Sequence, residues 1–148
     1  MVKYFAYGSN LDSKRMIERG VVFTSRHFGI LKDYKLVFNK KSSKNNLREG
    51  YANIVKSKGS VVEGGIYEIT EESVLLLDRY EGFPTHYSRE YIDIEAEDRT
   101  IRCIVYIAIT DKVMDGLKPS KEYFNKILEG KDLFTENYFN NLIKTEVL

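Results

Sequence analysis

Residues 3–16, KYFAYGSNLDSKRM, decide how the fold begins. The apolar run at 2–7 predicts a buried strand, and Asp12 is placed to cap a short helix over 13–19 that Gly20 closes. Between them, the Gly-Ser-Asn turn at 7–11 can simply change the direction of the chain. It can equally aim backbone N–H groups at an anion, because a strand ends and a helix opens at this point. The residues alone leave both interpretations open.

The stretches downstream of this turn are rich in strands. Apolar or alternating residues predict further strands over 21–38, 51–57, 61–69, 87–96 and 99–110. The first of these is either two strands or one bent strand, with a turn near Lys32 and Asp33. A turn at Lys58 and Gly59 is expected to join the next two. Gly64 and Gly65 indicate a bulge or a close approach of another backbone.

Three more helices are predicted, each preceded by a capping residue. Thr70 precedes the clearest one, over 71–80, in which Leu75, Leu76 and Leu77 supply the core side and Gly82 follows the last turn. Ser120 and Thr135 cap the two C-terminal helices. Their expected core residues are Phe124, Ile127 and Leu128 in one, and Phe139, Leu142 and Ile143 in the other. The polar, lysine-rich residues 39–50 are expected to form an exposed loop.

This order of elements predicts an α+β fold with a mainly antiparallel sheet that is strongly curled or closed. A doubly wound fold would require regular alternation of strands and helices, which is missing. The length of 148 residues fits a single domain over 1–148.

The composition excludes several classes of protein. With 43% hydrophobic and 30% charged residues and a net charge of +1, the chain lacks the basic excess of a nucleic-acid binder. One cysteine allows no internal disulfide, and no apolar stretch is long enough to span a membrane. The N-terminus lacks the apolar core of a signal peptide. We therefore expect a cytoplasmic monomer or homodimer, with no nucleic-acid or membrane partner.

Few residues carry obvious chemistry. His27 and His86 lack the spacing of metal ligands, so neither a metal site nor a cofactor is expected. Cys103 is interpreted as a core residue, and Ser9 lacks the sequence context of a nucleophile. Glu81 stands out because a carboxylate at the C-terminal end of a helix is disfavoured by the helix dipole. A pKa raised in this way suits proton transfer, although an exposed glutamate at a frayed helix end is the alternative.

The turn at 7–11 and the segment around Glu81, taken together, resemble the γ-glutamylcyclotransferase family, which includes γ-glutamylamine cyclotransferases and AIG2-like proteins. The similarity covers nearly the whole chain. It is carried by YFAYGSNL (4–11), GYANIV (50–55), VVEGGIYEI (61–69), LDRYEG (77–82), YSR (87–89), PSKEYFNKILEG (119–130) and the segment at 138–142. It departs from the family pattern at Lys131 and Phe134, which leaves the pocket rim undefined.

The resemblance implies a small mixed β-barrel with flanking helices and an enzyme without metal or cofactor. The implied reaction converts a small-molecule γ-glutamyl substrate to 5-oxoproline and a free amine. The substrate's own α-amine attacks its γ-carbonyl, with Glu81 as the general acid and base. The implied substrate-binding residues are Tyr7, Gly8, Ser9, Asn10, Leu11, Tyr87 and Tyr123. The alternatives are a γ-glutamylamine cyclotransferase and a non-catalytic small-molecule-binding protein on the same fold.

Overall fold

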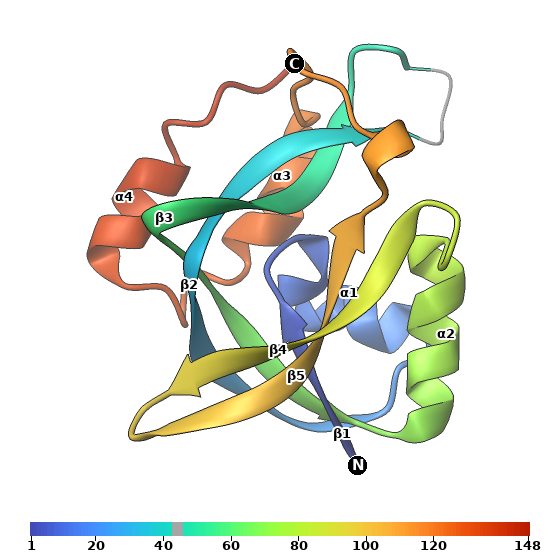
Figure 1. The fold of residues 1–148 in the computed structure, drawn as a ribbon, viewed down its shortest axis with the longest axis vertical. Helices are drawn as coiled ribbons and strands as arrows, with labels where there is room; N and C mark the ends of the chain where they lie inside the picture. Colours follow the sequence, from blue (N-terminus) through green and yellow to red (C-terminus); the bar gives the residue numbers. More distant parts are fainter. Residues whose placement is uncertain (43–45) are drawn as a thin grey trace.

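The computed structural model describes residues 1–42 and 46–148. Within these residues, strands β1 (Val2–Ala6), β3 (Gly50–Ile69), β2 (Phe23–Lys41), β4 (Tyr87–Ala96) and β5 (Arg99–Ala108) close into a barrel in that order. β1 runs parallel to β5, and the remaining neighbours are antiparallel (Figure 1). The fold is therefore the small mixed, mainly antiparallel barrel with flanking helices that was predicted.

β2 and β3 are each one long strand that bends without breaking. The predicted turn at Lys58 and Gly59 is wrong, because β3 continues through both residues. The bend is a register shift between Lys32 and Tyr34 of β2. There Asp33 adopts a φ of 64° and accepts a hydrogen bond from the N–H of Gly59 (2.9 Å), whose own φ is 84°. The two turn signals in the sequence therefore mark one shared kink, which lets the pair of strands wrap around the barrel.

Helix α2 (Glu71–Glu81) packs against the barrel and ends at the cavity described below. Thr70 accepts a hydrogen bond from the N–H of Ser73, and Gly82 ends the helix in the left-handed conformation (φ 67°), as predicted. The expected core face is partly wrong, because Leu75 is 63% exposed. Three consecutive residues span 200° of a helix, so they cannot share one face. Val74 and Leu77, three positions apart, are the buried pair.

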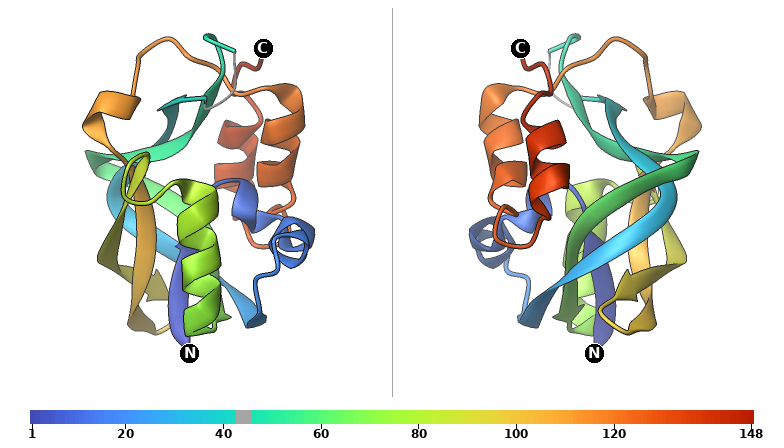
Figure 2. Two further views of the ribbon diagram at one scale, coloured as in Figure 1. Left: turned by 90° about the vertical axis from the view of Figure 1, so that its right-hand side faces the viewer. Right: turned by 90° about the vertical axis from the view of Figure 1, so that its left-hand side faces the viewer.

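The other helices lie on the side of the barrel where β1 ends. After the short turn η1 (Ser9–Leu11), α1 (Ser13–Glu18) is capped by Asp12. Helices α3 (Lys121–Leu128) and α4 (Glu136–Leu142) lie side by side (Figure 2) and are capped by Ser120 and Thr135. Phe124, Ile127 and Leu142 are buried as predicted, whereas Ile143 is exposed because α4 has already ended.

The barrel interior and the helix-facing side of the sheet form one core. It includes Phe5, Leu11, Met16, Ile54, Val62, Tyr67, Ile69, Leu77, Ile94, Val105 and Ile127. β1 lies too close to Gly64 for a side chain, since a Cβ there would lie 2.2 Å from the carbonyl oxygen of Ala6. β2 and β3 keep their pairing register through this position, so of the two predicted alternatives it is the close approach and not the bulge.

The predicted exposed loop at 39–50 is wrong at both of its ends. β2 extends to Lys41, and β3 begins at Gly50. Lys40 is only 2% exposed, and its ammonium donates a hydrogen bond to the carbonyl of Lys41 (2.6 Å). The middle of the expected loop, 43–45, lies outside the described residues. After β5, the turn η2 (Thr110–Lys112) leads to Val113, which forms an isolated bridge with Lys40.

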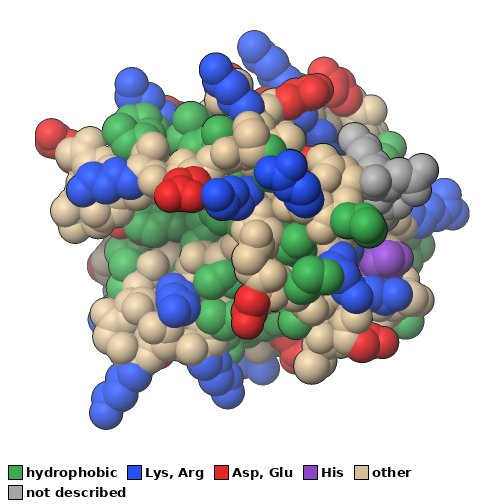
Figure 3. Space-filling model, turned by 90° about the horizontal axis from the view of Figure 1, so that it is seen from above, with side chains coloured by type: hydrophobic (Ala, Val, Ile, Leu, Met, Phe, Trp, Pro, Cys, Tyr) green, Lys and Arg blue, Asp and Glu red, His purple; other side chains and the backbone are tan. Residues whose placement is uncertain are grey.

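The surface mixes both charge signs. In the face shown in Figure 3, acidic side chains lie between the lysines and arginines. Among the described residues, no helix is long and apolar enough to cross a membrane. The same residues contain no group of three or more His, Cys, Asp and Glu side chains arranged to hold a metal ion.

Candidate functional site

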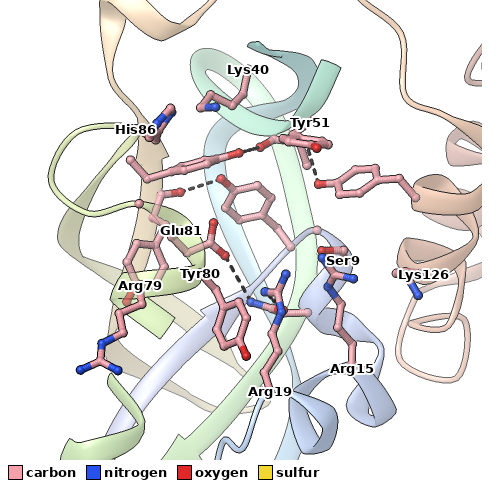
Figure 4. Close-up of a pocket in the computed structure, with 18 of the residues that line it drawn as sticks. Ser9, Arg15, Arg19, Lys40, Tyr51, Arg79, Tyr80, Glu81, His86 and Lys126 are labelled. Atoms are coloured by element: carbon pink, nitrogen blue, oxygen red, sulfur yellow. Dashed lines mark hydrogen bonds between the residues drawn. The ribbon is translucent and has the colours of Figure 1, made fainter. Parts of the chain in front are cut away.

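A cavity of about 520 Å³ opens where the 7–10 loop, the end of α2 and helix α3 meet the barrel. The loop contributes Tyr7, Gly8, Ser9 and Asn10. Strands contribute Tyr4, Lys40, Tyr51, Ala52, Tyr87 and Tyr106, and helices contribute Arg15, Arg19, Glu81, Tyr123 and Lys126, among others. Figure 4 shows that these side chains converge from elements far apart in the sequence. The cavity therefore joins the two motifs that the sequence singled out.

Glu81 and six of the seven predicted binding residues line this cavity, and Leu11 does not. The side chain of Leu11 is fully buried in the core. Its backbone N–H donates to the carbonyl of Gly8 (3.0 Å), and its carbonyl accepts from Arg26 (2.9 Å). Leu11 thus holds the loop from the core side, and the neighbouring residues of the loop form the cavity wall.

The loop itself is a single 3-10 turn. The N–H groups that it offers to an anion are therefore its own, and not those of the first turn of α1. The N-terminus of α1 is already occupied, because the Asp12 carboxylate accepts from the N–H of Lys14 (3.0 Å). The N–H of Lys14 is therefore not available to a ligand. The backbone N–H groups of Gly8, Ser9 and Asn10 donate to no other group in the described part of the chain. These amides are the free donors that the site offers to a ligand.

Gly8 leaves a space beside the loop that a side chain would fill. Its φ of −116° lies outside the left-handed region. A Cβ at this position would lie 3.1 Å from the Cβ of Ala52 and 3.6 Å from the hydroxyl of Tyr123. Any larger side chain would extend further into the narrow gap between the loop and strand β3.

Asn10 is committed to the protein's own hydrogen bonds. The residue is 3% exposed. Its Nδ2 donates to the hydroxyl of Tyr4 (2.9 Å) and to Oε1 of Glu81 (3.3 Å), and its Oδ1 accepts from Arg19 (3.0 Å). Its carbonyl accepts from the hydroxyl of Tyr67 (2.8 Å). Because both amide hydrogens and the amide oxygen of the side chain are in use, the Asn10 side chain orients Glu81, and only the backbone N–H of this residue is left for a ligand.

The Glu81 carboxylate points toward the loop and lies at the cavity wall (Figure 4). Burial raises the pKa of Glu81 above its usual range. The positive charges of Arg19, Arg15 and Lys40 and the hydrogen bond from Asn10 act against this rise. A carboxyl whose pKa is raised by burial, while nearby cations act against the rise, can both accept a proton and return it.

Tyr87 and Tyr123 meet at the backbone of one residue, Ala52. The hydroxyl of Tyr87 donates to the carbonyl of Ala52 (2.8 Å), and the N–H of Ala52 donates to the hydroxyl of Tyr123 (3.0 Å). These bonds replace strand pairing at Ala52, which falls within the register shift between Val37 and Lys40. Both tyrosines therefore hold the wall opposite Gly8 in place.

Asp78, one turn before Glu81, fixes the end of α2 to the barrel. Its carboxylate accepts from the hydroxyl of Tyr106 (2.6 Å) and pairs with Arg89 (2.6 Å). The carbonyl of Tyr106 in turn accepts from the hydroxyl of Tyr7 (2.6 Å). The bonds of Asp78 limit how far Glu81 can move relative to the loop.

Sequence reasoning missed the basic residues of the cavity. Arg15 and Arg19 are four positions apart, so α1 presents both on one face, and this spacing was a readable signal. Lys40 gave no such signal, because it lies in a stretch of polar residues typical of a loop. Its ammonium lies 5.6 Å from the ring centre of Tyr87. Burial, followed by the charge of Lys112, lowers the pKa of Lys40.

No side chain of the cavity is arranged as an activated nucleophile. The Ser9 side chain contacts the hydroxyl of Tyr123, which is not a base because burial raises its pKa well above the usual range. Cys103 is buried away from the cavity, and burial raises the pKa of its thiol to about 12. The thiol is therefore protonated at neutral pH.

Comparisons with known proteins agree with one another. The family model described as "Gamma-glutamyl cyclotransferase, AIG2-like" matches residues 4–126. The gamma-glutamylcyclotransferase of Bos taurus is 31% identical over 134 residues, which are 86% of this chain and 68% of the bovine protein.

Two solved structures share the fold. A structure described as a gamma-glutamyl cyclotransferase superimposes with a TM-score of 0.85 at 25% identity, over 99% of this chain and 89% of that one. The crystal structure of YkqA from Bacillus subtilis gives a TM-score of 0.85 at 25% identity, over 97% of this chain but only 53% of that one. From its sequence match and its fold, this chain belongs to the γ-glutamyl cyclotransferase, AIG2-like family of enzymes.

Proposed function

We propose that the protein cyclises a γ-glutamyl compound to 5-oxoproline and releases the amine. The observation that carries this proposal is the approach of the Glu81 carboxylate to the loop whose amides are free, with a hydrogen bond from Asn10 joining the two. The loop supplies donors for the charged end of a glutamyl group, and Glu81 supplies a group for proton transfer. This reaction needs no nucleophile from the protein, because the substrate carries its own.

The reaction balances with one carboxylate. Glu81 accepts a proton from the substrate's α-ammonium, and the resulting amine attacks the γ-carbonyl carbon. A new C–N bond closes the five-membered ring, and the original amide C–N bond breaks after Glu81 returns the proton to the leaving nitrogen. The ring nitrogen then loses its second proton through Glu81 to the released amine, which departs as an ammonium ion. Holding the glutamyl chain in a folded conformer lowers the barrier, by up to roughly 7–11 kcal/mol in the best intramolecular reactions. The cavity then has to bind the glutamyl chain, hold it in the folded conformer and transfer a proton. It does not have to form a covalent intermediate.

The free amides of Gly8, Ser9 and Asn10 are the proposed site for the α-carboxylate or for the oxyanion that develops on the γ-carbonyl. Backbone N–H donors fixed in a protein cavity stabilise such charge without having to reorganise during the reaction. Gly8 has no side chain to cover these amides, and an added Cβ would lie 3.1 Å from the Cβ of Ala52, so the glycine lets a ligand approach the backbone closely.

The charge of the cavity favours a leaving group that carries a carboxylate. Five basic residues line it (Arg15, Arg19, Lys40, Arg79 and Lys126), against three glutamates (Glu49, Glu81 and Glu122). Arg15 and Lys126 lie toward Ser9, away from His86 (Figure 4). We therefore favour a γ-glutamyl amino acid over a γ-glutamylamine, whose leaving group has no carboxylate for these cations to bind.

A matched pair of substrates tests this proposal. γ-Glutamylalanine and γ-glutamylethylamide differ only by the carboxylate on the leaving group. We expect 5-oxoproline release from both, with the larger kcat/KM for γ-glutamylalanine. Equal values would remove the preference for an amino acid. If neither these two, nor γ-glutamyl-ε-lysine, nor glutathione releases 5-oxoproline while any of them binds, the protein is a binding module on the family fold.

A further inference from the structure

Arg19, Asn10 and Glu81 form a continuous chain of hydrogen bonds that ends at the cavity. Arg19 Nη1 donates to Asn10 Oδ1 (3.0 Å), and Asn10 Nδ2 donates to Glu81 Oε1 (3.3 Å). We propose that Arg19 is a positioning residue, which acts through Asn10 to keep the Glu81 carboxylate ionised and aimed at the loop. This inference rests on the proposed function, in which the ionised Glu81 accepts a proton from the substrate.

The direction of this chain is set by Arg19. A guanidinium group has only donors, so the side chain that faces it must present an acceptor. The amide oxygen of Asn10 therefore faces Arg19, and the amide nitrogen faces Glu81. A carboxamide that donates to a carboxylate stabilises its ionised form and not its protonated form. With Arg19 removed, the amide is free to rotate and present its oxygen to Glu81.

Arg19 is itself held in place by contacts other than a carboxylate. It follows the last residue of α1, its N–H donates to the carbonyl of Arg15 (3.0 Å), and its guanidinium carbon lies 4.5 Å from the ring centre of Tyr80. Among the residues described, it forms no ion pair. Its charge is therefore not neutralised by a direct partner and acts on Glu81.

Among the residues that the structure describes, Arg19 is the basic group joined to Glu81 through hydrogen bonds. The groups that face it are Arg15 and Arg19 of the α1 segment, Lys40 of β2, Tyr4 of β1, Tyr7 of the loop, Tyr87 of β4, Tyr106 of β5 and Tyr123 of α3. Burial raises the pKa of Glu81, and Arg19 is the strongest influence in the other direction. Neither Arg15 nor Lys40 donates a hydrogen bond to Asn10 or Glu81 in the described structure.

Two substitutions, four positions apart, separate the effect of a positive charge near Glu81 from the effect of the hydrogen bond between Arg19 and Asn10. Arg19→Met removes the charge and the hydrogen bond, and Arg15→Met removes only a charge. Lys14→Met, at an exposed position of the same helix, is the control for losing a cation from α1. The titration midpoint of the Glu81 carboxyl is followed by ¹³C NMR in the free protein, and its signal is assigned by its loss in Glu81→Gln. The acid limb of kcat/KM for γ-glutamylalanine is measured on the same proteins.

We expect Arg19→Met to move both the Glu81 midpoint and the acid limb to higher pH by about one unit, which is a tenfold loss of kcat/KM below the midpoint. Arg15→Met should produce a smaller shift, Lys14→Met none, and Arg19→Lys should recover part of the effect. An unchanged midpoint in Arg19→Met overturns the inference. So does an equal loss of kcat/KM at every pH, which would indicate a purely structural role.

A second variant covers the case in which Arg19→Met fails to fold. Asn10→Asp keeps the shape of the side chain but replaces the Nδ2 donor by a second carboxylate oxygen, so the Glu81 midpoint should rise even though Arg19 is present. An unchanged midpoint in this variant also contradicts the inference. The NMR titration needs no turnover. If the wild-type protein releases no 5-oxoproline, the proposed function fails, and the titration still decides whether Arg19 acts on Glu81.

Discussion

Asn10 Nδ2 lies 3.3 Å from Oε1 of Glu81, although 71 residues separate them in the chain. This hydrogen bond joins the YGSN turn to the end of helix α2. Both partners are firmly held, because Asn10 is also bonded to Tyr4 and Arg19, and Asp78 fixes α2 one turn before Glu81. The position of the proposed proton-transfer group is thereby tied to the position of the proposed binding loop.

Gly8→Val should block the cavity without unfolding the protein. The new side chain would start 3.1 Å from the Cβ of Ala52 and extend into the space in front of the loop amides. We expect a native circular dichroism spectrum and no detectable binding of 5-oxoproline by calorimetry. In the double variant Gly8→Ala/Ala52→Gly, removal of the Ala52 methyl group makes room for the new methyl group at position 8, so this variant should bind 5-oxoproline. Unchanged binding in Gly8→Val would place the site elsewhere.

Ser9→Ala should keep a substantial fraction of the wild-type kcat. The hydroxyl of Ser9 has no base to activate it, since its partner is the buried hydroxyl of Tyr123, and the substrate supplies its own nucleophile. The loss should appear mainly as weaker binding. Mass spectrometry of the protein quenched during turnover tests the same point. A glutamyl ester on Ser9 would show that the mechanism uses a covalent intermediate.

The sequence predicts the helices, the mainly antiparallel sheet and the place of Glu81 at the end of a helix because these depend on local signals. Thr70, Ser120 and Thr135 each cap a helix as expected, and Gly82 ends α2. The order of elements predicts a curled or closed sheet, and the family resemblance specifies the small barrel that the structure shows. The bend near Asp33 is one of the two predicted alternatives, whereas the turn predicted at Gly59 is wrong, because a strand bend and a hairpin turn use the same residue types.

The electrostatics of the site could not be predicted in the same way. Lys40 is buried only because β2 extends past the bend and brings it under Tyr51 and Tyr87. The sequence around it is indistinguishable from a solvated loop. Likewise, Asn10 was expected to bind substrate, and only the three-dimensional arrangement shows that Tyr4, Arg19 and Glu81 use its side chain fully.

Tyr87→Phe and Tyr123→Phe should each destabilise the protein. Each leaves one backbone group of Ala52 without its partner, the carbonyl in the first case and the N–H in the second, at a cost of about 1–3 kcal/mol. Urea unfolding measures both. Tyr91→Phe, at a position that is 58% exposed, is the control and should change the free energy of unfolding by less than about 0.5 kcal/mol. Equal values for all three would contradict the role of Ala52.

Glu81→Gln should stabilise the fold increasingly as the pH rises from acid to neutral. Burial raises the pKa of Glu81 in the folded protein above that of the unfolded chain. Below both pKa values the carboxyl is neutral in both states and contributes no difference. Between them the unfolded chain ionises first, so the folded state loses stability, and above both a constant penalty remains. Gln avoids this penalty.

Thermal unfolding of the two proteins from pH 3 to pH 7 measures the effect. The melting temperatures should coincide at the acid end and diverge toward neutral pH, with the variant higher. A wild-type protein that is the more stable of the two at neutral pH would mean that the cations around Glu81 outweigh its burial.

The most direct test compares turnover and binding in wild type and Glu81→Gln. Gln keeps the size of the side chain and can still accept the hydrogen bond from Asn10, but it cannot carry a proton. The account predicts that 5-oxoproline release from γ-glutamylalanine falls by roughly 10²–10⁴-fold, the usual contribution of general acid–base catalysis, while the Kd for the same compound changes little. A variant that turns over like the wild type would show that Glu81 does not transfer the proton.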